Sequence, residues 1–267
     1  MGLTLAAIVI VFLLPRIPQS QAYHNFADHR PLFGIPNCLN VISNFPFLVF
    51  GTLGLFFLLR QGGSNARTHF IESRERWPYV VFFIGIALTS FGSGYYHLAP
   101  GNERLVWDRL PMTLAFMSFL AATVAERISV RTGLQMLVPL LAIGAGSVLY
   151  WHLSELRGTG DLRPYIIVQF YPLVAIPLLI LLWPARYTRS ADLVPVLGLY
   201  AVAKLVELLD VSIFGLGRIV SGHTLKHLAA AAATYWLLRM LSLRCPAEIE
   251  PLRDRDANGH GDAQRHG

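Results

Sequence analysis

Seven apolar stretches, each about 20 residues long, constrain the fold of this chain more than any other feature. A helix rises 1.5 Å per residue, so about 20 apolar residues are needed to cross the ~30 Å of bilayer hydrocarbon. The stretches cover residues 39–59, 78–98, 106–125, 133–152, 164–183, 192–214 and 221–243. Only 14% of the residues are charged and the mean hydropathy is +0.49, both typical of membrane proteins. The sequence therefore predicts an all-α polytopic membrane protein with seven transmembrane helices.

The segments outside these stretches are too short to form a soluble domain. Residues 1–22 contain a ten-residue apolar run, two prolines and the sequence "SQA", which indicates a signal peptide, a signal anchor or an extra short helix. Residues 23–38 follow as an extracytoplasmic leader, and 39–243 form the membrane domain. Residues 244–267 are polar without apolar periodicity, so we expect a disordered cytoplasmic tail.

The arginines indicate the orientation in the membrane. The formal charge is +6, but the arginines are sorted by membrane side, so we do not expect a nucleic-acid partner. More arginines follow the odd-numbered helices, which places those loops in the cytoplasm, and fewer precede them. We expect a bacterial inner-membrane protein with its C-terminus in the cytoplasm. Cys38 and Cys245 then lie on opposite sides and cannot form a disulfide.

Polar side chains gather at the outer ends of three predicted helices. The stretch "FGSGYYHLAP" ends the second helix with Ser93 and His97 on one face, and "VWDRLPM" begins the third with Asp108. The last helix opens with His223 and His227, one helical turn apart. Three histidines supply three ligands of a tetrahedral zinc ion and leave the fourth position for water. The pattern predicts an open, catalytic type of zinc site.

Other interpretations of these residues stay open. A single histidine near the interface is usually hydrogen-bonded or reaches toward water, and a serine or aspartate near a helix end often caps or packs. Haem fits less well, because its two axial ligands generally come from different helices, whereas histidines four residues apart converge on one point. A proton relay built from histidines and carboxylates is a non-enzymatic alternative.

The sixth predicted helix carries three charged residues at three-residue intervals, Lys204, Glu207 and Asp210. They lie near one face of the helix. The only other lysine of the chain, Lys226, lies between the two histidines of the last helix. These lysines suit pairing with Glu207 or Asp210 inside the bundle, or contact with a substrate.

Four short motifs resemble the alkaline ceramidases, part of a seven-helix superfamily that includes the adiponectin receptors. They are "NVISN" at 40–44, "SGYYH" at 93–97, "DRLPM" at 108–112 and "HTLKH" at 223–227. The resemblance covers residues 37–243 and implies a zinc-dependent amidase that hydrolyses the N-acyl bond of ceramide. His97, His223 and His227 match the family's zinc ligands. Asp108 matches the aspartate that contacts the zinc-bound water, and Ser93 the serine that assists the oxyanion.

The expected partner is a membrane lipid, ceramide or another N-acyl lipid. The opposing hypothesis is a receptor-like, proton-handling or ion-handling seven-helix protein with a structural metal site. Some family members also bind calcium through an acid-rich segment that aligns with Asp28 and Asn37, but Asn37 stands where a glutamate is expected. This departure argues against calcium. Thr224, Leu225 and Lys226 replace the aromatic residues of the animal enzymes, which argues against an identical substrate.

Overall fold

A computed structural model of the chain describes residues 2–60 and 69–247. Within these residues every regular element is a helix. The α-helices are α1 Gly2–Leu13, α2 Cys38–Ile42, α3 Phe45–Arg60, α4 Arg76–Leu98, α5 Asn102–Arg127, α6 Val130–Leu156, α7 Arg163–Leu182, α8 Leu193–Leu208, α9 Asp210–Gly215 and α10 Gly222–Leu243. Three short 3-10 helices are η1 Gln21–His24, η2 Ser73–Glu75 and η3 Ser190–Asp192. The predicted all-α class is confirmed.

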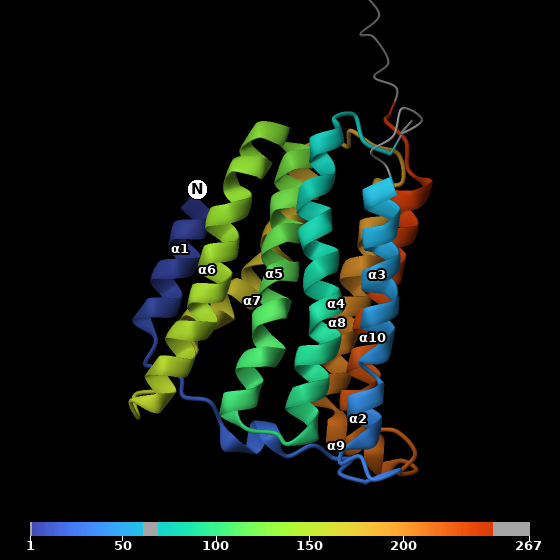
Figure 1. Cartoon of the computed structure of the whole chain (residues 1–267). Helices are drawn as coiled ribbons and strands as arrows, with labels where there is room; N and C mark the ends of the chain where they lie inside the picture. The colour runs from blue at the N-terminus through green and yellow to red at the C-terminus, as the bar shows by residue number, and fades with distance from the viewer. Residues whose placement is uncertain (1, 61–68, 248–267) are drawn as a thin grey trace, which may run out of the picture.

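The long helices run side by side as one bundle (Figure 1). Helix α5 lies inside it and packs on α4, α6 and α7, while α10 packs on α8 and α3. Five segments are long and apolar enough to cross a membrane, as expected of an integral membrane protein: Cys38–Arg60, Ser73–Leu98, Asn102–Arg127, Val130–Leu156 and Arg163–Leu182. The remaining predicted spans, 192–214 and 221–243, correspond to α8 with α9 and to α10.

Two predicted spans are interrupted where sequence reasoning expected one helix. The first is divided between α2 and α3 at Ser43 and Asn44. Pro46 has no backbone N–H to continue the hydrogen bonds of α2 but is tolerated in the first turn of a helix, so a new helix starts here. The other break falls at Leu209, between α8 and α9. Both breaks face the start of α10, where the candidate site lies.

The N-terminal residues form part of the folded bundle. Helix α1 has 12 residues, fewer than a membrane span needs, and it packs against α7 (Figure 1). The chain then crosses the end of the bundle, and the Ile17 carbonyl oxygen accepts a hydrogen bond from the Leu162 amide (2.8 Å). The extra short helix is therefore present, whereas the predicted cleavage after residue 22 stays a prediction.

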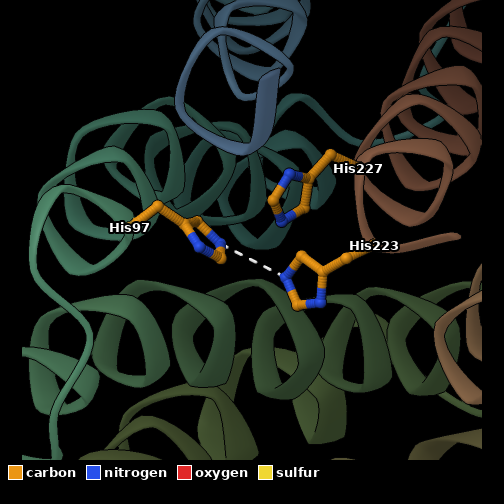
Figure 2. A group of neighbouring side chains, drawn as sticks. All are labelled: His97, His223 and His227. Carbon is orange, nitrogen blue, oxygen red and sulfur yellow. Dashed lines mark hydrogen bonds between the residues drawn. The ribbon is translucent and has the colours of Figure 1, made fainter. Parts of the chain in front are cut away.

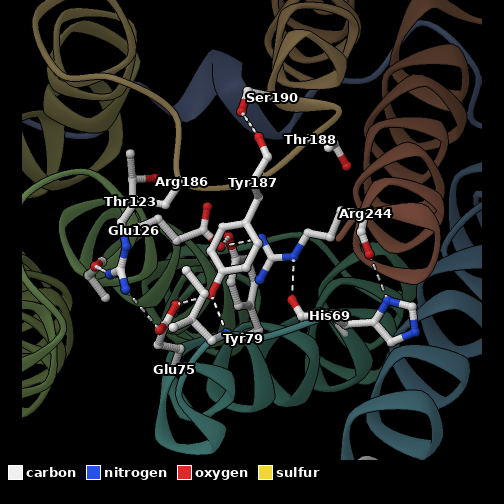
Figure 3. A network of polar contacts seen from close by, with 12 residues as sticks. His69, Glu75, Tyr79, Thr123, Glu126, Arg186, Tyr187, Thr188, Ser190 and Arg244 are labelled. Atoms are coloured by element: carbon white, nitrogen blue, oxygen red, sulfur yellow. Dashed lines mark hydrogen bonds and ion pairs between the residues drawn. The ribbon is translucent and has the colours of Figure 1, made fainter. Parts of the chain in front are cut away.

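A buried polar network connects the helices at the other end of the bundle, away from the segment that follows α1 (Figure 3). Arg244, at the end of α10, pairs with Glu126 of α5, and the Tyr79 hydroxyl donates to the same carboxylate (2.9 Å). Arg244 also exchanges hydrogen bonds with the backbone and ring of His69 (both 2.9 Å). The network joins the segments around α3, α5 and α10. Of the predicted tail 244–267, residues 248–267 lie outside the described part of the chain.

Candidate metal centre

Three buried histidines converge between α4 and α10 (Figure 2). His97 comes from the last turn of α4, and His223 and His227 come from successive turns at the start of α10. One ring nitrogen of each lies within 4.8 Å of the others, and all three side chains are buried. The sequence prediction that these three residues meet is confirmed.

The spacing of the rings fits a small metal ion. The Nε2 atoms of His97 and His223 are 3.3 Å apart. Two nitrogens held at about 2.05 Å by one tetrahedral zinc ion lie about 3.4 Å apart. The Nδ1 atom of His97 is buried without a hydrogen-bond partner among the described residues. Three neutral imidazoles form a donor set compatible with zinc.

Ser43 fixes the orientation and tautomer of His227. Its hydroxyl donates to the Asn40 carbonyl oxygen (3.1 Å), so it accepts the hydrogen bond from the Nδ1 atom of His227 (2.8 Å). With Nδ1 protonated, Nε2 keeps its lone pair for a metal ion. Sequence reasoning missed this role, although Ser43 lies within the "NVISN" motif. Its position at the break between α2 and α3 allows the contact.

Backbone contacts set the position of α10. The Asp210 carboxylate accepts from the amides of His223 (2.7 Å) and Ala27 (2.8 Å). Thr224 donates its hydroxyl hydrogen to the Asn40 side-chain oxygen (2.8 Å). At Gly222, a Cβ atom would lie 2.1 Å from the Val206 carbonyl oxygen, so only glycine permits this approach of α10 to α8. These contacts aim both α10 histidines at His97.

Ser93 and Asp108 come together at the junction of α4 and α5. A Cβ atom on Gly92 would lie 2.0 Å from the Trp107 carbonyl oxygen, so glycine brings the two helices into close contact here. The neighbouring Ser93 and the Asp108 carboxylate are both buried and line the same cavity. Sequence reasoning placed both residues at the level of the histidines, and the structure brings them to one cavity with His227.

A cavity of about 790 Å³ extends from these polar residues into the bundle. One end holds Ser93, Asp108 and His227, and the far end is formed by apolar side chains from four helices, including Phe82, Phe119, Ile176 and Leu237. The separation of Ser93 from Phe82 along α4 is 11 residues, or about 16 Å. This is about half the thickness of the bilayer hydrocarbon.

The cavity is lined by α7 and α8, which barely pack on each other although they are consecutive. Phe170 of α7 and Leu208 of α8 line it and are 42% and 84% exposed. The cavity wall therefore reaches the surface of the bundle between these helices. From the other side, the ring of Phe26 covers the metal centre, with its centre 4.6 Å from that of His97 and 4.5 Å from that of His223. Phe26 was not predicted, because nothing in the leader marks it.

Both lysines of the chain contact Glu207 on the cavity wall. The Lys204 and Lys226 ammonium groups lie 2.6 and 2.8 Å from its two carboxylate oxygens. The predicted pairing of the lysines within the bundle is therefore confirmed for Glu207. Asp210 differs from the prediction: the helix break at Leu209 turns its carboxylate toward the backbone of α10 and the leader.

The two residues aligned with a calcium site have protein partners. Both Asp28 oxygens accept hydrogen bonds from the Arg30 guanidinium (2.8 Å each), which holds the pKa of Asp28 below its usual value. The Asn37 side chain donates to the His97 carbonyl oxygen (2.9 Å). Asn37 thus supports the end of α4 rather than facing Asp28.

No family model matches this sequence, and no curated protein matches it. The resemblance to the alkaline ceramidases rests on the four sequence motifs alone.

Proposed function

We propose that this protein is a zinc-dependent intramembrane amidase. It hydrolyses the N-acyl bond of ceramide or a similar lipid amide to a free fatty acid and a sphingoid-type amine. The observation that carries the proposal is the position of Ser93, Asp108 and His227 at the polar end of a deep apolar cavity, beside a cluster of three buried histidines. An acyl chain fits the apolar end, which leaves its amide bond beside the histidines.

Each polar residue has a role in this reaction. His97, His223 and His227 would hold zinc, and a bound zinc ion would supply a Lewis acid for a carbonyl oxygen and would lower the pKa of a water molecule to about 7. Asp108 accepts the proton of the attacking water and passes it to the amine nitrogen as the C–N bond breaks. The Ser93 hydroxyl donates a hydrogen bond to the oxygen of the acyl carbon as negative charge develops there.

The membrane arrangement that goes with this function has seven spans. Helix α8 with α9 forms the sixth span and α10 forms the seventh, whose 22 residues reach about 33 Å. The arginine distribution supports a periplasmic site and a cytoplasmic C-terminus in a bacterial inner membrane. The lipid enters sideways, between α7 and α8.

The opposing candidate is a receptor-like or proton-handling protein with a structural metal. The charged cluster of Lys204, Glu207 and Lys226 on the cavity wall is the observation that favours it. The two candidates differ in the role of Asp108, which an enzyme needs for turnover and which holds no metal.

The test measures fatty-acid release from ceramides and other N-acyl lipids by the detergent-purified, zinc-loaded protein. We expect release by the wild type. Asp108→Asn should keep its zinc and lose about 10²- to 10⁴-fold in kcat, the usual contribution of a general acid–base group. Asp192→Asn is the matched control, because Asp192 lies at the end of the bundle opposite to Asp108. Hydrolysis retained by Asp108→Asn removes that residue from the mechanism, and zinc without any release supports the receptor-like candidate.

A further inference from the structure

Arg109 brings an unpaired positive charge to the polar end of the cavity. It follows Asp108 on α5, is 5% exposed and lines the cavity wall. Its Nη2 atom donates to the Gln19 side-chain oxygen (2.6 Å), whereas Nη1 is buried without a hydrogen-bond partner. None of the ion pairs among the described residues includes Arg109. Among the described residues, no carboxylate oxygen therefore lies within ion-pair distance of Arg109, and the nearby buried carboxylate is that of Asp108.

Aromatic rings hold the guanidinium group in place. Its central carbon lies 4.2 Å from the ring centre of Trp151 and 4.5 Å from that of Tyr165. Trp151 is fully buried in the bundle. Cation–π contacts of this kind stabilise the cation and fix its orientation but leave its N–H donors free. Arg109 is thus preorganised with both N–H groups of Nη1 unused.

The other charged groups on the cavity wall do not balance this cation. Glu207 is shared between Lys204 and Lys226, and Asp108 is the other carboxylate on the wall. Three cationic side chains therefore face two carboxylates on the wall, before any metal ion is counted. A buried charge without a partner is costly, which favours a site that is completed by an anionic ligand.

We propose that Arg109 binds an anionic group, a carboxylate or a phosphate, on the amine half of the lipid amide. This inference rests on the proposed amidase function. The acyl half occupies the apolar end of the cavity, so the amine half remains at the polar end beside Arg109. The preferred substrate is then an N-acyl amine with a negatively charged head group, rather than a neutral ceramide.

The test compares three amides that share one acyl chain: an N-acylglycine with a carboxylate, an N-acylethanolamine phosphate, and the neutral N-acylethanolamine. Hydrolysis by the zinc-loaded wild type and binding to the Asp108→Asn protein are both measured. We expect one or both anionic amides to exceed the neutral one by about 10- to 100-fold in kcat/KM and in affinity, the usual effect of a hydrogen bond to a charged group. The first two amides distinguish carboxylate from phosphate.

Variants test the assignment to Arg109. Arg109→Gln should abolish the preference, and Arg109→Lys should retain only part of it, because an ammonium group lacks the planar fork. Arg104→Gln is the matched control, since Arg104 lies on the same helix but contacts Tyr95. Zinc content and thermal unfolding verify that each variant folds. The comparison of the three amides in the wild-type protein does not depend on any variant.

The results separate the two proposals. Hydrolysis with equal kcat/KM for neutral and anionic amides overturns the anion site and leaves the amidase function standing. Binding of the anionic amides that depends on Arg109, without hydrolysis of any amide, supports the anion site and overturns the amidase function. If Arg109→Gln lowers kcat/KM and affinity equally for all three amides, Arg109 is a structural residue, and the inference is overturned.

Discussion

At the residue scale, the candidate metal centre depends on side chains that orient the histidines as much as on the histidines themselves. Ser43 sets the tautomer of His227, and Asp210 holds the backbone of His223. Residues that hydrogen-bond to metal ligands usually contribute 10- to 100-fold to metal affinity. Replacement of Ser43 should therefore lower the metal affinity while all three histidine ligands remain in place.

Ser43→Ala should lower zinc affinity by about 10- to 100-fold, because the His227 ring loses the partner of its Nδ1 atom. Competition with a chelator of known affinity measures the effect. Ser147→Ala is the control, since the Ser147 hydroxyl bonds only to Gly144 within its own helix. Equal zinc affinity in Ser43→Ala and the wild type would show that Ser43 has no part in orienting the ligand.

At the element scale, the leader between α1 and α2 covers the end of the bundle that holds the three histidines. Arg30 donates to both Asp28 oxygens and to the carbonyl oxygens of Arg218 (2.7 Å) and Ile219 (2.8 Å) in the loop after α9. The same leader places Phe26 over the histidines and Gln19 beside Arg109. A loss of the Asp28–Arg30 pair therefore loosens the cover of the metal centre.

The stability that Asp28 contributes should depend on pH. Its hydrogen bonds from Arg30 lower its pKa in the folded protein, so the contribution is complete above the unfolded-state pKa of about 3.9 and is lost as the pH falls through the folded-state value. Thermal unfolding of the wild type and Asp28→Asn should differ at neutral pH and converge in acid. Asp192→Asn serves as the comparison, and a difference for Asp28→Asn that stays constant down to pH 3 contradicts the expectation.

The helices themselves were largely predictable from the sequence, and the breaks in them were not. Apolar length alone located the long helices, because lipid requires every backbone group to be paired within a helix. The interruption at Ser43 was signalled by Pro46, whereas no glycine or proline marks the interruption at Leu209. That break depends on the contact of Asp210 with α10 and the leader, a tertiary interaction that periodicity does not report.

At the scale of the whole molecule, the topology of alternating helices was enough to predict that His97, His223 and His227 meet. What it could not predict is the cavity beside them or the charge on its wall. Sequence reasoning assigned no site role to Arg109, which is buried with its guanidinium group close to the rings of Trp151 and Tyr165. The packing of α5 on α6 and α7 buries Arg109. No local sequence pattern indicates that packing.

Ser93, Asp108 and His227 lie at one end of an apolar cavity that reaches the surface between α7 and α8. The network around Arg244 closes the other end of the bundle, about the full length of α10 away. Such an arrangement suits a substrate that is delivered from the bilayer, with its chain inside the bundle and its amide bond at the histidines. The account depends on one zinc ion bound by the three histidines.

Metal analysis of the purified protein tests that claim most directly, with zinc measured per chain and its ligands identified by X-ray absorption. We predict one zinc per chain with three imidazole nitrogens at about 2.0–2.1 Å, and loss of the zinc in His227→Ala but not in His152→Ala, whose histidine lies on α6 outside the cluster. Absence of zinc from the wild type, or equal zinc in both variants, would contradict the account.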